Sequence, residues 1–173
     1  GITREDVDEF ALSSQMKAKE AQEKCRLSRE ITPVTIREGR KERVLSADEN
    51  PRPETTLQSL ARIPAVKPDG VHTGGNSSGI VDGAAALVMT TAGKAREMGV
   101  KPIGELVSWG VAGVDPHFMG IGPVPASLMA MRRAGIELKD LKHIEINEAF
   151  GGQYLAVERE LNLDRSKVNV NGG

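Results

Sequence analysis

The stretch from His143 to Gln153, HIEINEAFGGQ, decides the expected fold because two kinds of periodicity meet in it. A short β-branched run ends at Asn147, and apolar residues then recur at helical spacing. This pattern predicts a strand over residues 142–146 that is followed at once by a helix over residues 148–161. A strand that leads directly into a helix is the repeating unit of a layered α/β sheet.

Asn147, at the junction, has two interpretations. Asn is one of the preferred residues at a helix N-cap, so its spacing alone favours a structural role at the start of the helix. The alternative is a functional role, because open α/β sheets bind ligands at the carboxyl ends of their strands. A neutral amide there can hold a water or polarise an oxygen. The two roles are compatible only if the cap does not use the Asn147 side chain.

The rest of the chain divides into two halves of different character. The first half reads as a helix over residues 4–24, capped by Thr3 and Asp6, followed by a surface hairpin within residues 31–45 and a short helix within residues 55–63. The second half alternates strand and helix, which predicts an α/β layered sheet. Its expected strands are 84–89, 103–109 and 168–170, and its other expected helices lie within 90–99 and 125–134.

The composition excludes several classes of function. The chain has 173 residues, which suits one domain or a piece of a larger one. Its formal net charge of -1 offers no general attraction to nucleic acid. A single cysteine permits no intrachain disulfide, and no apolar run approaches the roughly 20 residues that span a bilayer. The N-terminal sequence has the character of neither a signal nor a transit peptide. The three histidines, His72, His117 and His143, lack the spacing of a metal site, so we expect no metal.

Two glycine-rich loops are candidate ligand contacts. Gly74–Gly79 has almost no side-chain bulk, and it is either a tight turn or a backbone surface for an amide-bearing ligand, with Ser78 as a hydroxyl partner. It precedes an expected strand and is not a dinucleotide fingerprint. The loop around Met119 either packs in the core or lines an acyl or pantetheine slot, because Met fills irregular apolar gaps. Cys25 has no visible histidine partner, so we do not expect it to be a nucleophile.

Four motifs taken together resemble the thiolases over essentially the whole chain. They are NEAF, GGNSSGIVDGAAALVM, GVDPHFMGIGPVPA and the terminal VNVNGG. The stretches RPETTLQSLARIPAVKPDG and QYLAVERELNLDRSKVNVNGG are most similar to degradative 3-ketoacyl-CoA thiolases of the mitochondrial type. The resemblance implies a layered α/β/α/β/α fold that is incomplete in this chain. Residues 1–79 would form the later part of a CoA-binding loop domain, 80–102 the last strand and helix of the N-terminal half, and 103–173 the beginning of the C-terminal half.

The resemblance also implies what else the activity requires. Thiolases carry a nucleophilic cysteine upstream of the part that matches here, a catalytic histidine directly after VNVNGG, and a second cysteine further on. We therefore expect an internal fragment that is inactive alone. The expected parent is a mitochondrial enzyme of fatty acid β-oxidation that cleaves 3-ketoacyl-CoA with CoA, and it forms a dimer or tetramer. CoA is its substrate, and no cofactor is expected. The alternatives are a non-catalytic CoA or acyl-CoA binding module and a ketoacyl synthase relative, although the latter places a histidine motif where this chain has Asn147-Glu148.

Residue roles follow from the same resemblance. Asn147 would hold a water that, with the histidine, stabilises an enolate oxygen. Gly75 and Ser78 would meet the pantetheine, and Val66 stands where the family usually has Phe. The glycine pair 151–152 replaces the commoner small or Pro residues after NEAF. The remaining expected contacts are Arg52, Ser59 and Ile63 near the CoA nucleotide, and Met119, Ala149 and Phe150 along the pantetheine tunnel.

Overall fold

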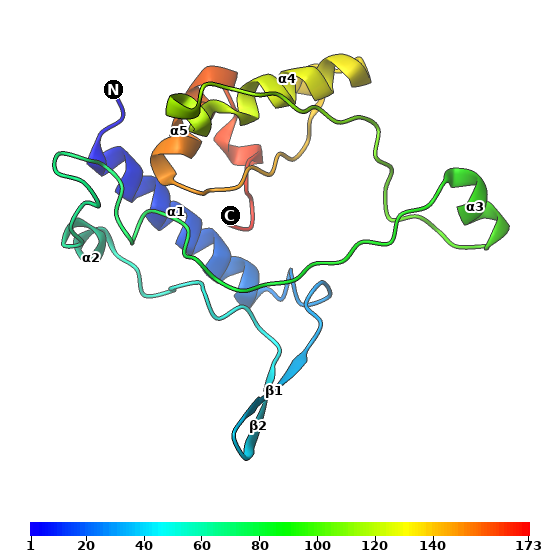
Figure 1. Cartoon of the computed structure of the whole chain (residues 1–173), viewed down its shortest axis with the longest axis horizontal. Coiled ribbons are helices and arrows are strands. Elements are labelled where there is room, and N and C mark those ends of the chain that lie inside the picture. Colours follow the sequence, from blue (N-terminus) through cyan, green and yellow to red (C-terminus); the bar gives the residue numbers. More distant parts are fainter.

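A computed structural model describes all residues, 1–173. Figure 1 shows a body in which helices α1 and α5 lie together, a separate hairpin, and a long arc that carries α3 away from the body. The arc consists of residues 80–107. The α-helices are α1 (Arg4–Glu23), α2 (Leu57–Ala61), α3 (Ala92–Glu97), α4 (Pro123–Ala134) and α5 (Gly151–Leu161). The strands are β1 (Val34–Glu38) and β2 (Lys41–Leu45), and the 3-10 turns are η1 (Pro116–Ile121), η2 (Leu138–Asp140) and η3 (Arg165–Lys167).

Helix α1 begins where the sequence predicts, at a capping box. The Thr3 backbone N–H donates to Asp6 at 2.8 Å, and the Asp6 N–H donates to the Thr3 hydroxyl at 3.1 Å. These bonds satisfy two backbone donors that a helix start otherwise leaves free. The bonds from Thr3 also hold the pKa of Asp6 below its usual value.

The core lies between α1 and α5. Phe10 of α1 stacks on Tyr154 of α5 with ring centroids 4.2 Å apart and planes 13° from parallel. Val7, Leu155 and Val168 complete this buried cluster. Burial, with the Glu158 carboxylate as the second cause, raises the pKa of the Tyr154 phenol. The first helix of the chain is thus held by the last one.

The predicted strands of the layered sheet do not form, and this part of the prediction is wrong. Residues 84–89 and 103–107 form no hydrogen bond with another segment, and Val88 and Ile103 are fully exposed, at 102% and 109%. Ser108 and Trp109 contact α4 only through side-chain bonds, from the Ser108 hydroxyl to the Ala130 carbonyl and from Arg133 to the Trp109 carbonyl, each at 2.7 Å. The predicted strands 142–146 and 168–170 are reduced to one parallel bridge between Ile144 and Val168. A strand requires the backbone groups of a neighbour, and no other segment pairs its backbone with residues 84–89 or 103–109. The hairpin is the only sheet.

The predicted helices form, with shifted ends. The helix expected over 125–134 begins two residues earlier, at Pro123, because proline suits the first turn. The short helix expected within 55–63 spans only Leu57–Ala61, and Thr56 is its cap. The helix expected from Glu148 begins at Gly151 instead.

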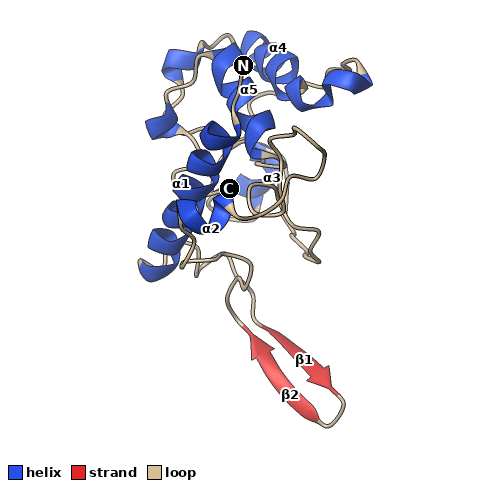
Figure 2. Ribbon diagram, turned by 90° about the vertical axis from the view of Figure 1, so that its left-hand side faces the viewer, coloured by secondary structure: helices blue, strands red, loops and turns tan.

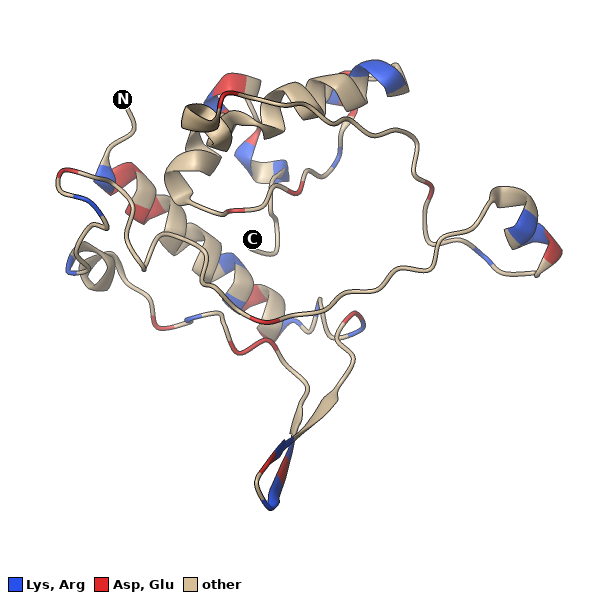
Figure 3. Cartoon of the chain, viewed as in Figure 1, with Lys and Arg blue, Asp and Glu red and all other residues tan.

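The β1–β2 hairpin is a charged projection. Figure 2 shows it extending away from the helices, and Figure 3 shows Lys, Arg, Asp and Glu along it. Its register pairs Val34 with Leu45 and Glu38 with Lys41. Cross-strand ion pairs such as Arg37–Glu42 at 2.6 Å are exposed, so each contributes little stability. No helix of the chain combines the length and apolarity needed to span a membrane.

A pair of valine substitutions tests this division between body and arc. Val157→Ala removes two buried methyl groups from α5, and we expect it to lower the free energy of unfolding by about 2 kcal/mol. Val88→Ala is the same chemical change on the exposed arc, and it should alter that free energy by less than about 0.5 kcal/mol. Urea unfolding of the two variants measures both values. Equal destabilisation would show that the arc is packed.

Candidate functional site

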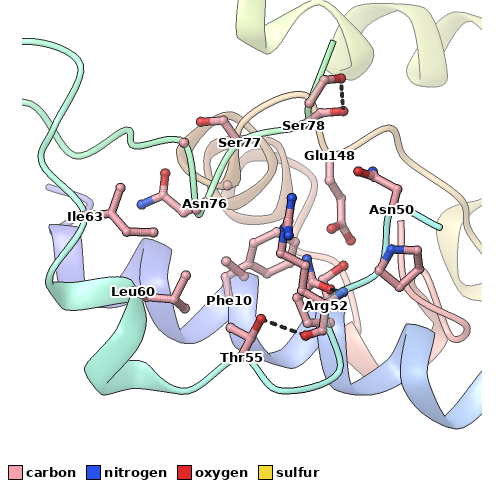
Figure 4. A pocket seen from close by; sticks show the side chains of 18 of the residues that line it. Phe10, Asn50, Arg52, Thr55, Leu60, Ile63, Asn76, Ser77, Ser78 and Glu148 are labelled. Atoms are coloured by element: carbon pink, nitrogen blue, oxygen red, sulfur yellow. Dashed lines mark hydrogen bonds between the residues drawn. The ribbon is translucent and has the colours of Figure 1, made fainter. Parts of the chain in front are cut away.

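A cavity of about 660 Å³ lies between α1, the segment before α2, α2 itself and the glycine-rich loop. Its volume falls in the range of small-molecule sites. Figure 4 shows side chains from these elements directed toward a common space. Five of the residues expected to bind substrate line the cavity together: Arg52, Ser59, Ile63, Gly75 and Ser78.

Helix α2, one wall of the cavity, is fixed at both ends. A capping box forms at its start, where Ser59 N–H donates to the Thr56 hydroxyl at 3.1 Å and Thr56 N–H donates to the Ser59 hydroxyl at 3.0 Å. At its far end, Arg4 of α1 donates through Nη2 to the carbonyls of Leu60 at 2.8 Å and Ile63 at 2.9 Å. A cation at a helix C-terminus also suits the helix dipole.

The glycine-rich loop is held by a buried carboxylate of α1. Asp8 is only 4% exposed, and it accepts from Arg4 Nε at 2.8 Å and from Asn76 Nδ2 at 2.7 Å. Asn76 Oδ1 in turn accepts from the Thr73 N–H at 2.7 Å. A buried carboxylate is stable only when it is paired and hydrogen-bonded. Here its two partners set the position of α2 and of the loop.

Gly75 is the point where the loop and α2 approach most closely. A Cβ at this position would lie 2.5 Å from Ile63 Cδ1 and 2.8 Å from Leu60 Cδ2. A Cβ at the neighbouring Gly74 would meet nothing within 4 Å. A side chain at position 75 would therefore collide with the ends of the Ile63 and Leu60 side chains, whereas a side chain at position 74 would meet open space.

The same loop decides where α5 begins. Ser78 N–H donates to the Ala149 carbonyl at 3.0 Å, and Gly151 N–H donates to the Asn76 carbonyl at 2.9 Å. These two bonds flank an antiparallel bridge between Ser77 and Phe150, and they keep Phe150 extended at φ -144° and ψ 135°. Helical geometry can start only after this pairing, at Gly151.

Asn147 is consequently not a helix cap, and that interpretation is wrong. The N-cap residue of α5 is Phe150, and the Asn147 side chain is exposed and makes no hydrogen bond. Its amide is free to meet a ligand. The next residue, Glu148, lines the cavity, and Figure 4 shows its carboxylate directed into that space.

Three expected contact residues lie outside this cavity. Met119 is 68% exposed on η1, while Ala149 and Phe150 pair with the loop from its other side. Sequence reasoning also missed residues that the structure places at the site, among them Glu148 and Gln15. Gln15 of α1 accepts from the Arg52 N–H at 2.7 Å. Glu148 could have been found, because it belongs to the NEAF motif, whereas Gln15 carries no local signal.

Comparisons with known proteins agree with this architecture. Residues 1–93 match the family "Thiolase, N-terminal domain", and residues 100–173 match "Thiolase, C-terminal domain". The chain is 44% identical to the Homo sapiens mitochondrial 3-ketoacyl-CoA thiolase and 45% identical to a Rhizobium meliloti acetyl-CoA acetyltransferase. Both alignments cover 99% of this chain and 44% of the relative, so the chain spans less than half the length of these relatives.

Solved structures show the same relation in three dimensions. The Bacillus anthracis acetyl-CoA acetyltransferase matches with a TM-score of 0.97 and 50% identity, over 99% of this chain and 44% of that one. The human mitochondrial 3-ketoacyl-CoA thiolase in complex with CoA matches with a TM-score of 0.94 and 44% identity, over 99% of this chain and 43% of that one. The fold is therefore that of the α/β class to which these solved structures belong. This chain belongs to the thiolase family, and the expected fold class is confirmed.

Alanine substitutions at the two neighbouring glycines test the close approach. Gly75→Ala must displace the ends of the Ile63 and Leu60 side chains, and we expect it to lower the free energy of unfolding by about 1 kcal/mol, the low end of the usual cost of overpacking. Gly74→Ala, in open space, should change it by less than about 0.5 kcal/mol. Urea denaturation gives both values, and a harmless Gly75→Ala would contradict the packing described here.

Proposed function

We propose that this chain supplies a CoA-binding region and an enolate-stabilising amide to a thiolase that cleaves 3-ketoacyl-CoA with CoA. The observation that carries the proposal is the convergence of Arg52, Ser59, Ile63, Gly75 and Ser78 on one cavity. These residues come from three separate segments of the chain, and the family resemblance alone predicts each of them as a contact. The human relative solved with CoA supports the same ligand.

The lining of the cavity suits the parts of CoA. Arg52 contributes a guanidinium, which binds phosphate oxygens through charge-assisted hydrogen bonds. Leu60, Ile63 and Phe10 contribute apolar surface for the adenine ring or the pantetheine chain. Ser78 adds a hydroxyl that can donate or accept at an amide. CoA enters as a substrate, and the proposed chemistry uses no cofactor.

The proposed reaction proceeds in two half-reactions. A cysteine thiolate attacks the 3-keto carbon, the C2–C3 bond breaks, and its electron pair forms the enolate of acetyl-CoA, which then takes a proton. The thiol of a second CoA attacks the enzyme thioester and carries off the shortened acyl group. Cys25 is exposed beyond the end of α1 and lies among the residues that line a second cavity, so we propose that the nucleophile comes from outside residues 1–173.

Asn147 has the chemistry that the enolate step needs. Negative charge appears on the thioester oxygen only as the carbon–carbon bond breaks, so a useful partner must stabilise that charge without binding the ground state equally well. A neutral amide that holds a water can do this. The absence of any intramolecular bond to the Asn147 side chain supports this role.

Among thiolases, we propose the degradative, mitochondrial type that acts in β-oxidation as a homo-oligomer. The stretches RPETTLQSLARIPAVKPDG and QYLAVERELNLDRSKVNVNGG favour it. Relatives named acetyl-CoA acetyltransferase match at similar identity, so that activity is the second candidate. Turnover of 3-ketoacyl-CoA substrates of increasing chain length distinguishes the two, because the second candidate requires a strong preference for acetoacetyl-CoA.

Experiments on the isolated 173-residue chain test CoA binding and catalysis separately. We expect calorimetry to detect CoA binding, because all five predicted contacts at this end of the substrate, from Arg52 to Ser78, line one cavity. We expect no turnover of acetoacetyl-CoA with CoA, because removing members of a catalytic unit costs several orders of magnitude in rate. Arg52→Ala, which removes the cation of the cavity, should weaken the binding, and Arg40→Ala, on the hairpin turn, should not. Turnover above background would contradict the proposal, and tight binding without any active longer form would favour a non-catalytic CoA-binding module.

Asn147 is tested in a thiolase of full length that carries residues 1–173 in place of the matching stretch of the human mitochondrial enzyme. Asn147→Ala should lower kcat by about 10²–10³-fold while KM changes little, because the lost contact acts only in the transition state. Asn147→Asp should be at least as harmful, since a carboxylate repels an enolate. Glu145→Gln, at an exposed position two residues earlier, is the matched control. A fully active Asn147→Asp enzyme would show that the catalytic role is wrong.

A further inference from the structure

The segment that ends at Asn147 is held first by a parallel β-bridge at Ile144 and then, at Ile146, by hydrogen bonds to a side chain. Ile144 N–H donates to the Lys167 carbonyl at 3.0 Å, and Asn169 N–H donates to the Ile144 carbonyl at 2.9 Å. This is one step of a parallel ladder. In the next step, Ile146 would pair with the backbone of residues 169 and 171. It pairs with a side chain instead.

The Asn169 amide replaces the missing peptide group. Its Oδ1 accepts from the Ile146 N–H at 2.8 Å, and its Nδ2 donates to the Ile146 carbonyl at 2.8 Å. The side chain is 1% exposed, so these bonds are shielded from water. Both backbone groups of Ile146 are therefore satisfied by one amide, as they would be by a neighbouring strand.

The backbone of Asn169 explains why a side chain is needed. Its φ is 45°, a left-handed conformation that Asn tolerates better than most residues. The chain then turns, with the Gly172 N–H donating to the Asn169 carbonyl at 3.0 Å, and it packs against α1 where the Gly173 N–H donates to the Ser14 hydroxyl at 3.3 Å. The backbone after Asn169 therefore no longer pairs with the segment 144–146, and the Asn169 side-chain amide forms the hydrogen bonds to Ile146 instead.

A third hydrogen bond of the Asn169 amide reaches Glu148, the residue after Asn147. Asn169 Nδ2 also donates to Glu148 Oε1 at 2.7 Å. The residues on either side of Asn147 are thus held by the same amide, while the Asn147 side chain has no partner of its own. The position of the Asn147 amide therefore depends on how its two neighbours are held.

We propose that Asn169 is a positioning residue, which sets the place of the Asn147 amide and of the Glu148 carboxylate beside it. The inference rests on the proposed function for its catalytic meaning, but not for its geometry. The site needs one acceptor and two donors in a single plane, which only an amide supplies. Aspartate has the same shape, but it would direct an oxygen at the Ile146 carbonyl and at the Glu148 carboxylate.

The geometric part is tested in the 173-residue chain by amide hydrogen exchange of Ile146, followed by NMR. In Asn169→Asp the Ile146 N–H should exchange about tenfold faster or more. The carboxylate keeps the acceptor for this N–H, but it loses both Nδ2 donor bonds and repels the Ile146 carbonyl and the Glu148 carboxylate, which favours local opening. Asn171→Asp is the matched control from the same motif. The Asn171 Oδ1 accepts from Arg26 Nη1 at 3.0 Å, so a carboxylate there keeps its partner and Ile146 exchange should not change.

Two further variants keep this test decisive. If Asn169→Asp unfolds the chain, the uncharged Asn169→Ser removes the paired amide without adding a charge, and it should show the same faster exchange. Adding Glu148→Gln to Asn169→Asp restores a donor to the new carboxylate, and it should recover part of the lost protection. Unchanged Ile146 exchange in both Asn169 variants would overturn the proposal.

The catalytic part is tested in the full-length thiolase that carries residues 1–173. Displacement of a reacting group by about 1 Å can cost on the order of 10²-fold in rate, so Asn169→Asp should lower kcat by about 10–100-fold. KM for CoA should stay within about threefold, because the cavity walls are held by other residues, and a merely structural role would not produce this split. Asn171→Asp should match the parent. Faster Ile146 exchange with an unchanged kcat would overturn the positioning role, whereas an inactive parent would count against the proposed function and leave the exchange result standing.

Discussion

The buried carboxylate of Asp8 is the interaction on which the rest of the site depends. It lies on α1, and its two oxygens accept from Arg4 and Asn76. Arg4 extends this hold to α2, and Asn76 extends it to the glycine-rich loop. Three segments far apart in the sequence thus meet around one charge. A buried charge is costly unless every partner is in place, so the network favours one arrangement of the cavity over looser ones.

From the glycine-rich loop the constraint passes to α5. Pairing of the loop with residues 149–151 delays the start of the helix to Gly151. The delay leaves Asn147 on an extended segment, where no helix terminus competes for its amide. The second restraint on that segment comes from Asn169 on its other side. The position of the free Asn147 amide is therefore set by two neighbouring restraints.

The sequence predicted the helices and the caps of α1 and α2 well because those signals are local, whereas the cap of α5 expected at Asn147 is wrong. Thr3 and Asp6 form the predicted capping box, and Gly135 closes α4 in a left-handed conformation. The strands at 84–89 and 103–109 failed because strand formation depends on a neighbour that no local pattern reveals. The grouping of Arg52 with Gly75 and Ser78 followed from family resemblance and not from periodicity. The Asp8–Asn76 contact joins residues 68 apart in the sequence, and no spacing rule detects such a pair.

The chain therefore contains two parts with different needs: a cavity that is held by its own hydrogen bonds, and an arc whose apolar side chains are not buried. The walls of the cavity are held by hydrogen bonds among residues of this chain, from α1 to the start of α5. The arc, in contrast, exposes Val88, Ile103 and other large apolar side chains that cost free energy in water. Burial of that surface must come from outside these contacts, through a longer chain or through association. The proposed CoA cavity is therefore held by contacts within this chain, whereas burial of the exposed arc requires contacts that these residues do not supply.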